Sequence, residues 1–443
     1  FPNRDKFPFG IRGCAHSIES MGMKMGLWFE PEMVSTDSEL YRAHPDWCLH
    51  VPGRPSQRGR NQLVLDMGRA DVRAYLLKKI SKILKSASIS YVKWDMNRYL
   101  TEVFSLQLQK ANQGEASHRF MMGTYELLHS FVTAFPDLLL ETCSGGGGRF
   151  DPGMLYYSPQ IWTSDNTDAM NRVPIQYGTS LLYPARCMGS HYSVSPNHIT
   201  MRQCRSRTRA FVAMCGTFGF ELNLHTIPMD ERKMIPQYIR VHREVREIVN
   251  SGDLFRLWSP SDAPSAAWMY VTVDRKKAVV FAFNMGMRHW SDLMPTLRLQ
   301  GLDQGTDYAV TEPMPNEFTR KEDNLQVVRA TEPSYQLRQP KVWLSGAALM
   351  EAGLPIQFFA SDDATCFVLT AESKAGQDVA ASGPMMRHVG SNIRINNMGV
   401  YTTISDKVTS LTVENIRSVE WSGDSLANEG QGDDELICED LMF

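Results

Sequence analysis

The stretch that decides the fold is Ile-Ser-Tyr-Val-Lys-Trp-Asp-Met-Asn, residues 89–97. It begins with apolar and β-branched residues, as is typical of a buried strand, and ends with polar side chains at alternating positions. Because successive side chains of a strand point to opposite faces, Lys93, Asp95 and Asn97 are predicted to share one face. Polar groups are costly to bury, and parallel α/β barrels carry their active sites at this end of their strands. Taken alone, the Lys-x-Asp pair is equally consistent with an ion pair that only fixes the strand register.

Strand-like and helix-like segments alternate over the first 250 residues or so of the chain, which predicts an α/β fold with a parallel sheet. A helix is expected over residues 72–87, with Asp71 as its N-cap. A (β/α)8 TIM-barrel needs eight strands. The sequence therefore predicts an N-terminally incomplete TIM-barrel with about six strands, at residues 23–29, 89–97, 138–143, 158–165, 183–190 and 218–224.

The pattern changes at about residue 255, and three regions are predicted. Residues 1–254 form the partial catalytic TIM-barrel. Residues 255–372 contain short alternating or apolar segments separated by Pro and Gly, which indicates a C-terminal antiparallel β-sandwich. Residues 373–443 are an extension of unassigned role, and its acidic end at 429–440 is predicted to be disordered.

Composition excludes several classes of function. The 443 residues are 43% hydrophobic and 21% charged with a net charge of -3, so no electrostatic feature predicts a nucleic-acid or anionic-membrane partner. The sequence contains no run of 18 apolar residues, so no membrane span is predicted. The eight cysteines form no C-x-x-C, which argues against a zinc site and against a small disulfide scaffold. The lack of a glycosylation sequon and of a disulfide pattern favours a cytoplasmic location by a small margin, although the chain begins with Phe rather than Met.

Two carboxylates stand at the ends of predicted barrel strands. Asp95 lies near the C-terminal end of the strand at 89–97, and Asp165 ends the segment at 158–165. Paired carboxylates of this kind suit glycoside hydrolysis, in which one acts as nucleophile and the other as acid/base. Lys93 would favour the ionised form of Asp95. The apolar neighbours Ile161 and Trp162 would help Asp165 to keep its proton.

The other polar or glycine-rich features have ordinary structural interpretations when taken singly. Ser-Gly-Gly-Gly-Gly-Arg at 144–149 permits close backbone approach, but it matches no phosphate-binding spacing and is more typical of a flexible loop. The remaining interpretations are a buried apolar role for Cys143, a core position for Trp28, a solvated charge for Arg60, structural ion pairs for Glu30 and Glu32, and a cap or turn for Asp168.

Together, these stretches resemble the microbial α-galactosidases of glycoside hydrolase family 36. The resemblance is carried by Gly-Leu-Trp-Phe-Glu-Pro-Glu-Met-Val (26–34), Arg-Asn-Gln-Leu-Val-Leu-Asp (60–66), Tyr-Val-Lys-Trp-Asp-Met-Asn-Arg (91–98), Glu-Thr-Cys-Ser-Gly-Gly-Gly-Gly-Arg-Phe-Asp (141–151) and Trp-Thr-Ser-Asp-Asn-Thr-Asp (162–168). Leu-Ser-Gly-Ala-Ala-Leu-Met-Glu-Ala-Gly-Leu-Pro (344–355) is similar to the family's C-terminal sandwich. The likeness covers roughly residues 1–372.

The resemblance implies a retaining hydrolase that removes terminal α-linked galactose from oligosaccharides such as melibiose and raffinose. Asp95 matches the family's nucleophile and Asp165 its acid/base. Lys93 and Asn97 match residues that bond galactose hydroxyls. The positions that match the lining of the same sugar pocket are Trp28, Arg60, Cys143 and Gly146. No cofactor or metal is implied.

The chain departs from the family at its N-terminal side. Family members carry a β-sandwich and two further barrel strands before the segment that matches residue 1, so we expect an incomplete chain with exposed barrel edges. A homo-oligomer is expected only if that region is present. Two alternatives are left open at this point: transfer of galactose to another sugar, and a truncated, non-catalytic sugar-binding remnant.

Overall fold

The computed structural model describes residues 3, 5–286, 296–314, 341–356, 358, 361–372, 393–395 and 401–403. These residues form two compact units. The first contains the described residues up to Gln203 together with Val212–Pro228, and the second contains Cys204–Phe211 and the described residues from Met229 onward.

Among the described residues of the first unit, six parallel strands form one sheet in the order β1-β4-β5-β6-β7-β8. This confirms the prediction of an α/β barrel sheet with six strands. β7 begins later than expected because Ala185–Cys187 form a 3-10 turn directly after Pro184. The strands are β1 (Gly26–Phe29), β4 (Tyr91–Asp95), β5 (Leu139–Cys143), β6 (Gln160–Trp162), β7 (Met188–Ser193) and β8 (Thr217–Glu221).

Helices follow the strands along the chain, and a separate antiparallel pair, β2 (Met33–Ser35) and β3 (Gln62–Val64), lies between β1 and β4 in sequence. The α-helices are α1 (Gly10–Ser20), α2 (Glu39–Ala43), α3 (Ala70–Leu84), α4 (Ala116–Ala134), α5 (Pro152–Tyr157), α6 (Ala169–Thr179) and α7 (Ser206–Ala213). The 3-10 turns are η1 (Pro45–Trp47), η2 (Lys110–Glu115) and η3 (Ala185–Cys187). Within the described ranges, no helix is long and apolar enough to cross a bilayer.

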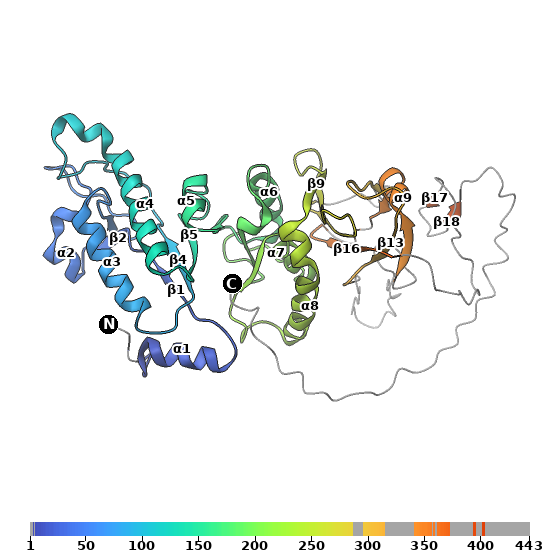
Figure 1. The fold of residues 1–443 in the computed structure, drawn as a ribbon, viewed down its shortest axis with the longest axis horizontal. Coiled ribbons are helices and arrows are strands. Elements are labelled where there is room, and N and C mark those ends of the chain that lie inside the picture. Colours follow the sequence, from blue (N-terminus) through green and yellow to red (C-terminus); the bar gives the residue numbers. More distant parts are fainter. Residues whose placement is uncertain are drawn as a thin grey trace. The chain divides into compact units, whose positions relative to one another are not determined.

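The outer face of β4 is buried against α3 and α4, which lie side by side in Figure 1. Val92 and Trp94 are 2% and 1% exposed, and the Trp94 ring meets Phe131 of α4 at a centroid distance of 5.4 Å. The apolar face of β4 therefore anchors the strand and leaves Lys93 and Asp95 for the opposite face.

The N-cap prediction for α3 is wrong. The helix begins at Ala70, and Arg69 occupies the N-cap position. The Asp71 carboxylate lies in the first turn, where it accepts hydrogen bonds from Arg69 at 2.8 and 3.1 Å and from the backbone N–H of Val72 at 3.0 Å. Acidic side chains are favourable in a first turn, so the residue type was a valid signal for the helix start but did not fix its boundary.

The second unit contains an antiparallel sheet in the order β14-β13-β16-β11-β10-β9 and the antiparallel pair β12–β15. Leu297, Leu349 and Leu354, from β12, α9 and β15, share one core with alternate residues of β10, β11 and β16. This confirms the antiparallel C-terminal domain. Its elements are α8 (Met229–Ser251), β9 (Asp253–Trp258), β10 (Ser265–Val271), β11 (Lys277–Asn284), β12 (Thr296–Leu297), β13 (Asp307–Thr311), β14 (Val342–Ser345), α9 (Gly346–Glu351), β15 (Leu354–Pro355) and β16 (Ala364–Ala371).

The predicted extension at 373–443 lies outside the described residues apart from one antiparallel pair, β17 (Ile393–Ile395) and β18 (Tyr401–Thr403). The predicted disorder of residues 429–440 falls wholly outside the described residues.

Candidate active site

Asp95 ends β4 and is only 5% exposed. The indole Nε1 of Trp28, on the neighbouring strand β1, donates a hydrogen bond to Asp95 Oδ2 at 3.0 Å. The backbone N–H of Met96 donates to Oδ1 at 2.9 Å. Trp28 is 52% exposed, so the interpretation of this residue as core is wrong, and its ring is open to a ligand beside the carboxylate.

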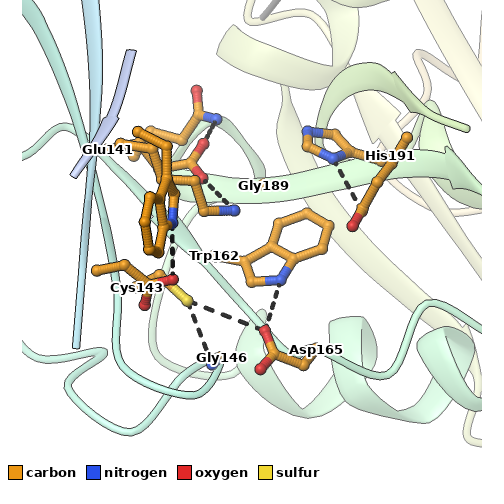
Figure 2. A network of polar contacts seen from close by, with 12 residues as sticks. Glu141, Cys143, Gly146, Trp162, Asp165, Gly189 and His191 are labelled. Carbon is orange, nitrogen blue, oxygen red and sulfur yellow. Dashed lines mark hydrogen bonds and ion pairs between the residues drawn. The ribbon is translucent and has the colours of Figure 1, made fainter. Parts of the chain in front are cut away.

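Cys143 lies opposite Asp95 in the β4–β5 register and contacts both candidate catalytic carboxylates. Its Sγ donates to Asp165 Oδ1 at 3.9 Å (Figure 2), and its register places it beside Asp95, whose carboxylate acts on the thiol electrostatically. Burial, together with the Asp95 carboxylate, raises the pKa of Cys143, so the sulfur keeps its proton at neutral pH. The thiol can therefore donate to a carboxylate while its sulfur accepts from the backbone N–H of Gly146 at 3.3 Å.

The glycine-rich turn after β5 is tightly packed and is not a free loop. Gly146 has φ of 83°, in the left-handed region that favours glycine. A Cβ at Gly146 would lie 2.7 Å from Ser164 Cα and 2.8 Å from the backbone N of Asp165. The absence of a side chain at Gly146 therefore lets this turn contact the segment that carries Asp165.

Asp165 follows β6 and is exposed. The predicted apolar shielding is wrong: Ile161 is buried in the core shared with α3 and α4, and it leaves Asp165 open to solvent. Trp162 does contact Asp165, but as a donor, because its indole Nε1 lies 3.1 Å from Asp165 Oδ1 (Figure 2). The other neighbours of this indole include the ring of His191, at a centroid distance of 4.5 Å.

Lys93 pairs with Glu141 and not with Asp95, the partner that the sequence spacing predicts. Lys93 and Glu141 are register partners on β4 and β5, and Nζ lies 3.2 Å from Oε1. Burial alone would lower the pKa of Lys93, but the neighbouring Glu141 carboxylate outweighs this, and the pKa is raised. Nζ also lies 4.6 Å from the centroid of the Trp162 ring. The ammonium is thus fixed between a fully buried carboxylate and an aromatic ring.

Glu141 and Gln160 belong to the site although the sequence pattern does not predict them. Gln160 on β6 is the register partner of Glu141, and its Nε2 donates to Glu141 Oε2. Lys93, Glu141 and Gln160 therefore form one row across three strands. The alternation rule applied to 89–97 would also have placed Glu141 and Cys143 on one face of the strand 138–143.

Arg60 and Asn97 meet at a third carboxylate. The Oε1 atom of Glu30 accepts hydrogen bonds from Asn97 Nδ2 at 2.8 Å and from Arg60 Nη1 at 3.2 Å. The Glu30 side chain is 6% exposed, whereas that of Arg60 is 55% exposed. Asn97 and Arg60, both predicted to bind sugar, are thus held by the buried carboxylate of Glu30, which follows β1. The other guanidinium donors of Arg60 can bind a ligand.

The neighbouring Glu32 is a structural ion-pair member, as its isolated interpretation predicted. It is fully buried, and Arg149 donates to its two carboxylate oxygens at 2.9 and 3.0 Å. This fork joins the end of the glycine-rich turn to the segment after β1. In the described part of the chain, no group of three or more His, Cys, Asp and Glu side chains is placed to hold a metal ion.

Two family models match the chain. Melibiase matches residues 1–252, and the glycosyl hydrolase family 36 C-terminal domain matches residues 265–370. Among curated proteins, alpha-galactosidase AgaA of Geobacillus stearothermophilus is 51% identical over 308 residues, which are 70% of this chain and 42% of that protein. Alpha-galactosidase Mel36A of Lactobacillus acidophilus is 46% identical over 305 residues, 69% of this chain and 41% of that protein. The chain thus spans about two fifths of the length of these relatives.

Solved structures show the same similarity. The GH36 alpha-galactosidase AgaB of Geobacillus stearothermophilus has a TM-score of 0.75 at 44% identity, covering 84% of this chain and 48% of that one. A variant of AgaA from the same organism, solved in complex with raffinose, has a TM-score of 0.74 at 44% identity with the same coverage.

Proposed function

The chain belongs to the melibiase family, glycosyl hydrolase family 36, and from this premise we propose that it is a retaining α-galactosidase. The observation that carries the proposal is the contact of two carboxylates, Asp95 and Asp165, with the single thiol of Cys143. Retaining glycosidases need a nucleophile and an acid/base whose carboxyl groups lie about 5–5.5 Å apart. A small neighbour shared by the two carboxylates supports such proximity.

In the first step, an oxygen of Asp95 attacks the anomeric carbon of a terminal galactose. The bond from that carbon to the glycosidic oxygen breaks, and Asp165 gives its proton to the departing oxygen. The held geometry of Asp95, with N–H donors on both oxygens, suits a nucleophile that must attack from a fixed position.

In the second step, Asp165 takes a proton from a water molecule. The water oxygen bonds to the anomeric carbon, the ester bond to Asp95 breaks, and galactose leaves with its original configuration. The exposure of Asp165 suits this role, because its carboxyl group must meet both water and the leaving sugar. Both proton transfers use this one carboxyl group, so the mechanism requires no metal or cofactor.

The residues around the two carboxylates would hold the sugar. Lys93 and Asn97 present an ammonium and an amide toward the hydroxyl groups, and Arg60 adds donors from the exposed side. Trp28 offers an exposed aromatic face, and Cys143 and Gly146, which bond to each other, would line the site between the carboxylates. The complex of the AgaA variant with raffinose supports oligosaccharides of that type as the substrate class.

The test is release of nitrophenol from p-nitrophenyl α-galactoside by the full chain, with Asp95→Asn as the inactive variant. We expect hydrolysis by the parent chain, none by D95N, and the α-anomer of galactose as the first product seen by proton NMR. A 2-deoxy-2-fluoro-galactosyl substrate should leave a covalent adduct on the peptide that contains Asp95. A first-formed β-anomer would overturn the retaining mechanism. A folded chain with neither turnover nor adduct would overturn the proposed activity.

A further inference from the structure

Arg172 of α6 is a buried cation that the proposed mechanism does not use. It is 3% exposed, and its donors reach Ser164 O at 3.1 Å, Gln176 Oε1 at 3.2 Å and the carbonyl oxygen of Gly189. Burial lowers the pKa of this guanidinium to about 10, and the charges of the Glu221, Glu141 and Asp165 carboxylates act against that lowering. The group is therefore still charged at neutral pH. A buried charge is costly unless it is hydrogen-bonded, and the groups that contact this one include the Ser164 carbonyl and the Trp162 ring, both beside Asp165.

The contacts of Arg172 converge on Asp165 by two routes. The first runs through the backbone, because Ser164, whose carbonyl accepts from Arg172, directly precedes Asp165. The second runs through Trp162, since the guanidinium carbon lies 4.7 Å from the centroid of that indole ring. The same indole donates its N–H to Asp165 Oδ1, as Figure 2 shows. Arg172 thus contacts both the chain segment and the ring that hold the Asp165 carboxyl group.

The Trp162 ring is closely fitted at this position. Gly189 of β7 lies beneath it, and a Cβ there would stand 2.8 Å from Trp162 Cε3. The guanidinium, which is itself bonded to the Gly189 carbonyl, therefore fixes the plane of the indole and with it the direction of the N–H. An N–H directed at Oδ1 leaves Oδ2 as the oxygen that can carry and deliver a proton.

We propose that Arg172 is a positioning residue for general acid/base catalysis, acting through Trp162 to hold Asp165 with Oδ2 as the proton-carrying oxygen. The inference rests on the proposed role of Asp165. A purely structural role, joining α6 to β7, would also make Arg172 important for stability. The two roles differ in their effect on chemistry: a misdirected acid affects substrates in proportion to their need for protonation of the leaving group.

The test compares a sugar leaving group, in melibiose, with nitrophenolate, which leaves readily without a proton. In Arg172→Gln and Trp162→Phe we expect kcat/KM for melibiose to fall at least about tenfold more than kcat/KM for p-nitrophenyl α-galactoside. Arg172→Lys should not rescue, because an ammonium lacks the planar fork that stacks on the ring and reaches three acceptors. Trp162→Phe keeps most of the packing, so it reports on the lost N–H even if the arginine variants fold poorly.

Azide gives a second readout. It attacks the galactosyl-enzyme without a general base, forming a bond to the anomeric carbon as the Asp95 ester bond breaks. Added azide should therefore accelerate turnover of the nitrophenyl substrate in R172Q and W162F. The matched control is Arg202→Gln, because Arg202 pairs with Asp168 at 2.9 Å at the start of the same helix but contacts neither Trp162 nor Asp165. R202Q should lower the unfolding temperature without changing the ratio of the two substrates or the response to azide.

The outcomes separate this inference from the proposed function. If Asp165→Asn itself shows no leaving-group dependence and no azide acceleration, the assignment of Asp165 fails, and this inference fails with it. If D165N shows both effects but R172Q and W162F lose only stability, with an unchanged substrate ratio, Arg172 is structural and the positioning role is overturned. Both effects in all three variants, and neither in R202Q, would support it.

Discussion

Gly146→Ala tests whether the glycine-rich turn positions Asp165, and Gly145→Ala is its matched control. Both glycines have positive φ, 56° at Gly145 and 83° at Gly146. An alanine in this conformation costs about 1–2 kcal/mol at either position. The two sites differ in space: a Cβ at Gly145 meets nothing within 4 Å, whereas one at Gly146 would lie 2.7 Å from Ser164 Cα and 2.8 Å from Asp165 N.

The expected difference follows from that contact. The backbone at Ser164 and Asp165 would have to withdraw by several tenths of an ångström, and overpacking of this kind costs about 1–3 kcal/mol. G146A should therefore be less stable than G145A by that amount in urea unfolding. A displaced acid/base loses rate steeply, since about 1 Å of misplacement can cost about 10²-fold. We expect kcat/KM for melibiose to fall between about tenfold and a hundredfold in G146A relative to G145A.

Two results would refute this reasoning. Equal stability of the two variants would show that the turn does not press on the Ser164–Asp165 backbone. A stability difference without any difference in kcat/KM would show that the contact exists but that the position of Asp165 does not limit the reaction.

Three further predictions concern buried charges. Glu141→Gln removes the main counter-charge of Lys93 and should lower the free energy of unfolding by about 3–5 kcal/mol near pH 7. The pKa of Lys93 is raised in the folded chain above its ordinary value of 10.5. The stabilisation by the ion pair is therefore fully present below pH 10.5 and is lost as the pH rises through the folded-state pKa. The stability difference between E141Q and the parent in urea unfolding should shrink in that alkaline range. Glu32→Gln leaves buried Arg149 without its carboxylate and should also cost about 3–5 kcal/mol. Glu39→Gln, in the exposed pair with Arg42, should leave the free energy of unfolding almost unchanged in the same assay. Asp168→Ala removes the N-cap of α6, whose carboxylate accepts from Met170 N at 2.8 Å, and should lower the free energy of unfolding by about 2 kcal/mol. Asp168→Asn keeps an acceptor, so its loss in thermal unfolding should be about half as large.

The sequence was a good guide wherever local alternation decides the outcome. Residues 91–95 place Trp94 in the outer core and Lys93 and Asp95 on the opposite face, as the period of a strand requires. The parallel order of six strands followed from the alternation of strand and helix segments. The cap role of Asp168 also followed from local sequence, because an N-cap needs only the next few backbone N–H groups.

The failures of the sequence analysis involve contacts between segments distant in the chain. The partner of Lys93 is set by the register of β4 against β5, which no local pattern specifies, so Glu141 was missed. Trp28 was assigned to the core on residue type, but its exposure depends on its place beside Asp95 at the end of β1. The environment of Asp165 depends on the turn after β5 and on the helix after β6, two elements outside its own segment.

The two candidate catalytic carboxylates receive matching support and differ in exposure, and that difference is informative. Each accepts one indole N–H, Asp95 from Trp28 and Asp165 from Trp162, and each contacts the thiol of Cys143. Asp95 is buried at the end of a strand, where its position is set by the sheet, while Asp165 is exposed on the segment after β6. A nucleophile needs a fixed line of attack, whereas an acid/base must exchange protons with a sugar and then with water. Asp165, which lies outside a strand, therefore depends more than Asp95 on contacts from other segments to hold its position. The glycine turn, Trp162 and Arg172 supply that support.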